Sequence, residues 1–142
     1  MLTTRTLGLV AVVVLPFLAG CATPVSEARL SDDVSNFVLG AAPSPPKSVF
    51  SPADEKVTLT VKFGYNFVGG YRTFRVRWVG PDGKPFLEEP TKTEWGSNET
   101  LIVSLPIANN VSSTMPGDWV VELWHKDELL VSRPFQIREP SS

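Results

Sequence analysis

The chain has 142 residues, with 13 basic and 15 acidic side chains, one histidine, one cysteine and a formal net charge of −2 at pH 7. A mildly acidic chain without clustered positive charge has no general affinity for nucleic acid, so we expect no nucleic-acid partner. A lone cysteine also excludes an internal disulfide framework. Folding must therefore depend on one hydrophobic core, and the length fits one domain.

Residues 1–20 have the pattern of a secretory signal. Arg5 precedes an uncharged stretch over residues 6–20 that ends in small side chains. This is the charged, apolar and small-residue order of an export signal. As a helix, residues 7–20 would span about 21 Å, less than the hydrocarbon layer of about 30 Å. Pro16 also interrupts the stretch, so we predict a signal peptide and not a transmembrane helix.

The residues Leu18, Ala19, Gly20 and Cys21 end this segment and resemble the lipobox of bacterial lipoproteins. The resemblance implies that the Cys21 thiol takes a diacylglyceryl group, that residues 1–20 are removed, and that the new amino terminus is acylated with a fatty acid such as palmitate. Several acyl chains would anchor the protein stably, because each buried methylene contributes about 0.8 kcal/mol. Ala22, in place of an aspartate that marks inner-membrane retention, implies the outer membrane, with the domain in the periplasm. The alternative is an ordinary secretory signal with a chance cysteine.

The mature chain divides into three predicted parts. Residues 21–33 are polar and lack a sustained period, which predicts a lipidated N-terminus and a flexible tether. Residues 34–139 form one predicted domain and residues 140–142 a tail. Within the domain, residues 34–40 could be a first strand, and the proline-rich residues 41–48 predict a stiff connection that cannot pair as a central strand.

The rest of the domain has a period of two, which is typical of half-buried strands. The inward rows are Val57, Leu59, Val61 and Phe63, then Phe74, Val76 and Trp78. A proline, aspartate and glycine at 80–85 predict a turn and a hairpin. Further strands are predicted over residues 86–93, 100–107, 119–125 and 129–137, with Trp119 joining Trp78 in the core.

The last hairpin supports one class of fold. "PGDWVVEL" at 116–123 followed by "LLVSRPFQI" at 129–137 resembles the closing hairpin of immunoglobulin-like modules in bacterial envelope proteins. It lacks the paired cysteines of antibody domains, so the resemblance concerns architecture only. We predict an all-β, immunoglobulin-like sandwich of two antiparallel sheets with about seven strands.

The sequence offers little for catalysis. His125, with Glu122, Asp127 and Glu128 nearby, could form half of a metal site or act as a general base. A metal normally needs three or four converging ligands, and polar residues collect at a hairpin tip without any such role. The serines have no G-x-S-x-G setting. We expect no enzyme activity, no catalytic residue, no metal and no cofactor.

Two surface features are candidate partner-binding sites. Arg72, Arg75 and Arg77 point outward and would form a basic stripe with Lys62 if those two strands pair. Their alternative is an ordinary solvated face. Trp124 lies on the outward row of its strand, where it either anchors a partner or is covered by the tether or a loop. The same two interpretations apply to Trp95, which is predicted to lie in a loop.

Three functions of different classes follow. The first is a lipid-anchored envelope lipoprotein that acts as a non-catalytic protein-interaction module, bound to the membrane through its lipid and to another envelope protein through its domain. The alternative is a small-ligand binder that stacks sugars or lipid moieties on Trp95 and Trp124. An enzyme comes third. The oligomeric state stays open.

Overall fold

The computed structural model describes residues 25–32, 45–64, 72–93, 100–110 and 115–139. These residues form strands β1 to β8 and one short 3-10 helix, η1 (Pro52–Asp54). Among them, no helix is long and apolar enough to cross a membrane. The strands are β1 (Val25–Ser31), β2 (Val49–Phe50), β3 (Lys56–Phe63), β4 (Arg72–Val79), β5 (Pro85–Thr93), β6 (Thr100–Pro106), β7 (Gly117–His125) and β8 (Glu128–Ile137).

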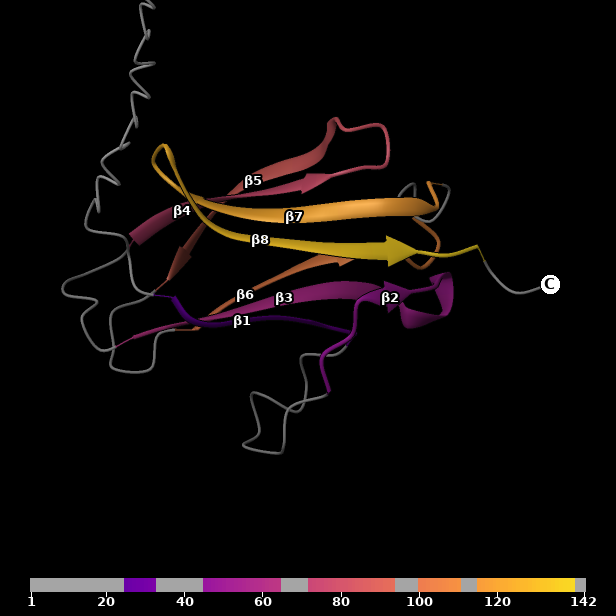
Figure 1. Cartoon of the computed structure of the whole chain (residues 1–142), viewed down its shortest axis with the longest axis horizontal. Helices are drawn as coiled ribbons and strands as arrows, with labels where there is room; N and C mark the ends of the chain where they lie inside the picture. The colour runs from indigo at the N-terminus through magenta and orange to yellow at the C-terminus, as the bar shows by residue number, and fades with distance from the viewer. Residues whose placement is uncertain (1–24, 33–44, 65–71, 94–99, 111–114, 140–142) are drawn as a thin grey trace, which may run out of the picture.

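The strands form two sheets that lie face to face (Figure 1). One sheet has the order β1-β3-β6 and the other the order β2-β8-β7-β4-β5. Neighbouring strands are antiparallel except the short β2, which pairs with β8 in parallel. The chain is therefore an all-β sandwich, as predicted. The parallel β2–β8 pair is the departure from the expected antiparallel sheets.

The core lies between the sheets and is built around aromatic side chains. Trp78 and Trp119 are both 0% exposed, as predicted. The Trp119 ring stacks on Phe135 at 6.1 Å between centroids and meets Phe86 edge-on at 5.3 Å. Its indole Nε1 donates a hydrogen bond of 2.9 Å to the carbonyl of Met115. The ring is thus buried without an unsatisfied polar atom, and its position fixes the inward row of β7.

The turn between β4 and β5 sets the register of that hairpin. Gly80 N–H donates to the carbonyl of Lys84 at 3.0 Å, and Gly83 N–H to that of Gly80 at 3.0 Å. The Asp82 carboxylate accepts from Lys84 N–H at 3.0 Å, and Gly83 has a φ of 75°, which favours glycine. The predicted turn is confirmed, and together with a bulge between Trp78 and Val79 it places Glu88 opposite Arg77.

The prediction of a flexible tether over residues 21–33 is wrong for β1. This segment pairs with β3 along its length, and Leu30 is 5% exposed. Val25 and Ala28 also pack against the core. A bulge between Val25 and Glu27 breaks the alternation of side chains, so the apolar residues do not show a period of two in the sequence. The strand predicted over residues 34–40 lies outside the described residues.

We expect Trp119→Ala to lower the free energy of unfolding by about 3–5 kcal/mol, because it removes a fully buried ring and leaves a cavity. Urea unfolding of the full chain measures this. Trp124→Ala is the matched control, since Trp124 is only half-buried on the outer face. Equal losses from both substitutions would contradict the assignment of Trp119 to the core.

Candidate functional site

Three of the sequence-predicted site residues meet on the outer face of the five-stranded sheet. In the pairing of β4 with β7, Arg75 lies opposite Trp124 and Arg77 opposite Glu122. Residues that are paired in neighbouring strands project from the same face of the sheet. Trp95 and Cys21 lie outside the described residues, so their roles stay predictions.

Ion pairs and hydrogen bonds hold these side chains together. The Glu88 carboxylate lies 2.9 Å from Arg75 Nε and accepts a hydrogen bond of 3.2 Å from Arg77 Nε. Arg77 Nη1 lies 3.7 Å from a carboxylate oxygen of Glu122. The same oxygen accepts a hydrogen bond of 2.9 Å from the indole Nε1 of Trp124. The result is one connected network across β5, β4 and β7.

The basic stripe expected if the strands of Lys62 and Arg75 paired does not form, because these strands lie in different sheets. Arg75 and Arg77 face two carboxylates, those of Glu88 and Glu122, so their charges are balanced within the network. Lys62 lies on β3, in the other sheet, because the chain crosses from one sheet to the other between β3 and β4. There it pairs with Glu27 at 3.2 Å. This surface therefore has no excess of positive charge.

An apolar centre lies within this network. The Cζ atoms of Arg75 and Arg77 lie over the Trp124 ring, 5.8 and 5.5 Å from its centroid. Leu129 lies opposite Trp124 in the β7–β8 pair and is 44% exposed. We use "the Trp124 face" for the set Arg75, Arg77, Glu88, Glu122, Trp124 and Leu129. It combines an aromatic and an aliphatic side chain with two guanidinium groups.

Sequence reasoning missed the roles of Glu88 and Leu129. The Glu88 partnership could not be found by counting strand pairs outward from the turn at 80–85, because a bulge between Trp78 and Val79 shifts the β4–β5 register by one residue. Leu129 could have been found by such a count, because the bulge between Leu123 and Trp124 lies farther from the β7–β8 turn than the Trp124–Leu129 pair. From the pair His125–Glu128 at the hairpin tip, the next pair outward is Trp124–Leu129.

His125 has structural contacts that account for its position. Its Nδ1 lies 3.3 Å from the carbonyl oxygen of Thr73, and its ring packs at 5.4 Å from the ring of Phe74. Within the described ranges, no group of three or more histidine, cysteine, aspartate or glutamate side chains could hold a metal ion. The geometry thus gives His125 a packing role at the end of β7.

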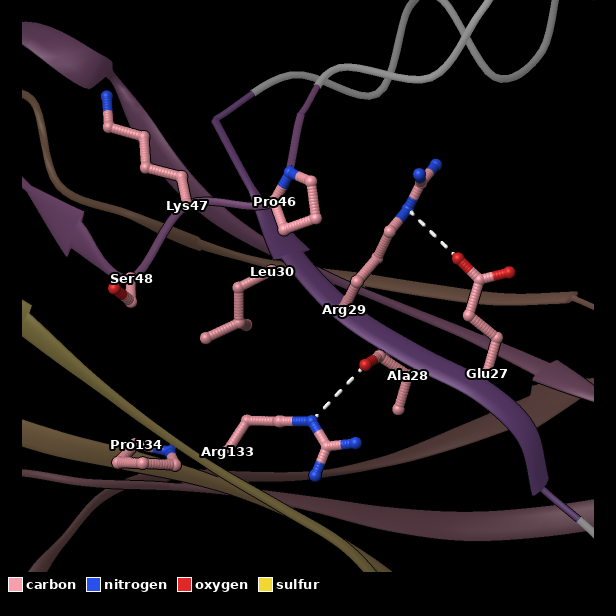
Figure 2. Close-up of a pocket in the computed structure, with 9 residues that line it drawn as sticks. All are labelled: Glu27, Ala28, Arg29, Leu30, Pro46, Lys47, Ser48, Arg133 and Pro134. Carbon is pink, nitrogen blue, oxygen red and sulfur yellow. Dashed lines mark hydrogen bonds and ion pairs between the residues drawn. The ribbon is translucent and has the colours of Figure 1, made fainter.

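A second surface feature is a shallow groove of about 430 Å³ between β1 and β8 (Figure 2). Arg29 points towards Glu27 there, at 3.9 Å. Arg133 of β8 reaches across the groove, and its Nε donates a hydrogen bond of 3.2 Å to the carbonyl of Ala28. The main-chain N–H of Lys47 donates to the carbonyl of Leu30 at 3.0 Å. These bonds join the outer edge of β1 to β8 and to the segment before β2.

Lys47 also links this groove to η1. Its ammonium group is 3.1 Å from Asp32 and forms a shorter ion pair with Asp54. Partial burial opposes the charge of Lys47, but hydrogen bonds and attraction from Asp54 and Asp32 outweigh it, so its pKa is raised. Burial likewise opposes the charge of Asp54, but Lys47 and the N–H of Ser51 outweigh it and lower the pKa of that carboxyl.

Comparisons with known proteins support no function. No family profile matches the chain, and no curated protein does. An immunoglobulin-like protein from Pseudomonas aeruginosa aligns at 11% identity with a TM-score of 0.47, over 80% of this chain and 98% of that one. The DNA glycosylase AlkC of Pseudomonas fluorescens aligns at 15% identity and 0.49, over 82% of this chain but only 31% of its own. The strand order of the two sheets by itself makes the fold an all-β, immunoglobulin-like sandwich, and nothing about activity follows from these matches.

We expect Asp54→Asn to destabilise the protein at neutral pH and to have little effect in acid. The pKa of Asp54 is lowered from its ordinary 3.8 in the folded state. Its ionised form therefore stabilises the fold above that pH, and the contribution is lost as the pH falls through the folded-state pKa. Urea unfolding of both proteins between about pH 2 and 7 measures the difference.

The control for this experiment is Asp127→Asn, which changes an exposed carboxylate at the β7–β8 turn. A stability difference between Asp54→Asn and wild type that stays constant across the pH range would contradict the role of the Lys47 ion pair.

Proposed function

We propose that the protein is a lipid-anchored envelope lipoprotein whose sandwich domain is a non-catalytic protein-interaction module. The Trp124 face is its binding surface. The observation that carries this proposal is the exposure of Leu129, 44%, directly beside the half-buried Trp124 and two arginines. Tryptophan and arginine are enriched among the residues that dominate binding energy, and an apolar centre with a polar rim is typical of interfaces.

The network favours binding because it holds the contact residues in place before a partner arrives. Arg77 bonds to Glu88, and Trp124 bonds to Glu122. Side chains that are already ordered lose less conformational entropy on association. The balanced charges give little long-range attraction, so recognition depends on shape and local hydrogen bonds, with a weak dependence on salt. The partner is a protein surface with an apolar group for Trp124 and Leu129 and hydrogen-bond acceptors for the guanidinium groups of Arg75 and Arg77.

The membrane anchor depends on the lipobox resemblance at Cys21. Strand β1 starts at Val25, and the short segment between Cys21 and Val25 spans at most about 14 Å when extended. An acylated Cys21 would therefore hold the sandwich close to the membrane surface. This arrangement favours a partner that is itself in or on the same membrane, the outer membrane in our proposal.

We expect Cys21→Ser to abolish labelling by a fatty-acid probe and to leave an uncleaved or mislocalised precursor, because the serine hydroxyl does not replace the thiol in lipidation. Ala22→Ser is the control, since it keeps the thiol. Labelling followed by membrane fractionation gives the readout. Equal labelling of Cys21→Ser and wild type would contradict the anchor and leave the proposed binding surface untouched.

We expect Trp124→Thr with Leu129→Thr to remove partner binding and leave the fold intact. Threonine suits a strand, and surface substitutions usually change stability by less than about 0.5 kcal/mol. Replacing Arg75 and Arg77 by glutamate is a poorer test, because the new carboxylates would face Glu88 and Glu122. Crosslinking in intact cells followed by purification of the tagged chain compares the partners captured, and thermal unfolding checks the fold.

The matched control replaces the ion pair Glu27–Lys62 on the outer face of the other sheet, as Glu27→Thr with Lys62→Thr. The proposal expects this control to keep every partner of wild type. If the folded Trp124→Thr, Leu129→Thr protein captures the same partners as wild type, the Trp124 face is not the binding surface.

A further inference from the structure

Strand β6 forms an outer edge of the three-stranded sheet. One hydrogen bond shows which of its residues direct their N–H and C=O groups away from the sheet. Ile107 N–H donates to the carbonyl of Glu55 at 2.7 Å, in continuation of the antiparallel β3–β6 register. Hydrogen-bonded pairs alternate along such a ladder. Leu101, Val103 and Leu105 therefore bond to β3, while Ile102 and Ser104 direct their N–H and C=O groups away from the sheet.

The other sheet edges carry features that block pairing with another strand. On β1, the outward carbonyl of Ala28 already accepts a hydrogen bond from Arg133 (Figure 2), and that of Leu30 accepts one from the main-chain N–H of Lys47. Strand β2 has only 2 residues and covers only the end of β8, and the rest of the β8 edge carries Glu128, Arg133 and Pro134. Strand β5 carries prolines and charges along its length: Pro85, Glu88, Glu89, Pro90 and Lys92.

Strand β6 has none of these features over most of its length. Its sequence, TLIVSLP, contains no charged side chain, and its one proline is the last residue. Ile102 and Ser104 are both partly accessible at their side chains. An uncharged edge strand with outward N–H and C=O groups is a template for a further strand.

We propose that β6 pairs antiparallel with β6 of a second copy of this chain, about a two-fold axis at Val103. This register places Ile102 opposite the partner's Ser104, and Ser104 opposite the partner's Ile102. Both residues direct their backbone groups outward, so each N–H meets a carbonyl of the other copy. The sheets of the two copies then join into one continuous sheet, β1-β3-β6 followed by β6-β3-β1.

The absence of charge on β6 favours a second copy over an unlike strand. In an isologous interface the same strand of each copy lies beside the other. A charged side chain on β6 would therefore lie close to the identical charge of the second copy near the two-fold axis. Charged side chains or prolines at the centre of an edge strand would oppose such self-pairing, and the centre of β6 has neither. The Trp124 face lies on the other sheet and stays free, which gives the dimer two copies of the proposed binding surface and an avidity gain towards clustered partners.

Cysteine crosslinking tests the register. Full-length chains with Ile102→Cys and with Ser104→Cys are expressed together in one cell and separately, and the membranes are oxidised. Directly opposite hydrogen-bonded residues have Cα atoms about 5.5 Å apart, within disulfide range. We expect a reducible band at twice the chain mass from the mixture, well above the bands from either variant alone or from wild type. Equal bands in all samples, or none in the mixture, would overturn the proposal, as would a crosslink to a protein of another mass.

A backbone substitution gives a second test that does not depend on disulfides. Ile102→Pro removes an N–H that points away from β3, a position where an edge strand tolerates proline. Ile102→Val keeps the N–H and serves as the matched control. Two differently tagged copies of the full chain should co-purify for wild type and Ile102→Val, and should separate for Ile102→Pro. Co-purification of folded Ile102→Pro at the level of Ile102→Val would overturn the proposal. Neither experiment changes the Trp124 face, so its outcome is separate from that of the proposed function.

Discussion

The aromatic layer between the two sheets is the constraint on which the rest of the structure depends. Trp78 meets Phe135 edge-on at 6.0 Å, and Trp119 stacks on the same ring. Because side chains alternate along a strand, the burial of Trp78 on β4 and of Trp119 on β7 leaves only one possible set of outward residues. That set includes Arg75, Arg77 and Trp124. A register slip of one residue would bury the arginines and expose the core tryptophans, so the core also determines the proposed binding surface.

The same architecture explains why the two sides of the sandwich differ. On one side, β1 passes close to β8, and Arg133 and the main chain of Lys47 occupy the outward carbonyls of β1. The short β2 then extends the five-stranded sheet beside it. On the other side, β5 is protected by prolines and charges, while β6 is not. Among the strands that the structure describes, β6 is thus the sheet edge without such blocking features.

Much of the fold could be predicted from the sequence, since the alternating rows of β3, β4 and β7 and the turn at 80–85 are local signals. Strand β1 could not, because its bulge breaks the period, and its pairing with β3 is a long-range contact. Part of the site could also be predicted from the sequence, because alternation alone places Arg75 and Arg77 on the same face of their strand. Whether Trp124 joined them, and whether the arginines were free or paired, depended on which strands became neighbours. Strand order is set by the whole core, so the sequence does not reveal that Lys62 lies in the other sheet or that Glu88 and Glu122 are the partners of the arginines.

The central claim is that the outer face of the five-stranded sheet contacts a partner in the membrane. Site-specific photocrosslinking tests it most directly, with a photoreactive phenylalanine derivative at Ser132, which is exposed and lies opposite Glu122. The same probe at Glu27, on the outer face of the other sheet, is the reference. In intact cells, the account predicts a discrete crosslinked protein from position 132 and not from position 27. Crosslinks from position 27 alone, or the same products from both positions, would contradict it.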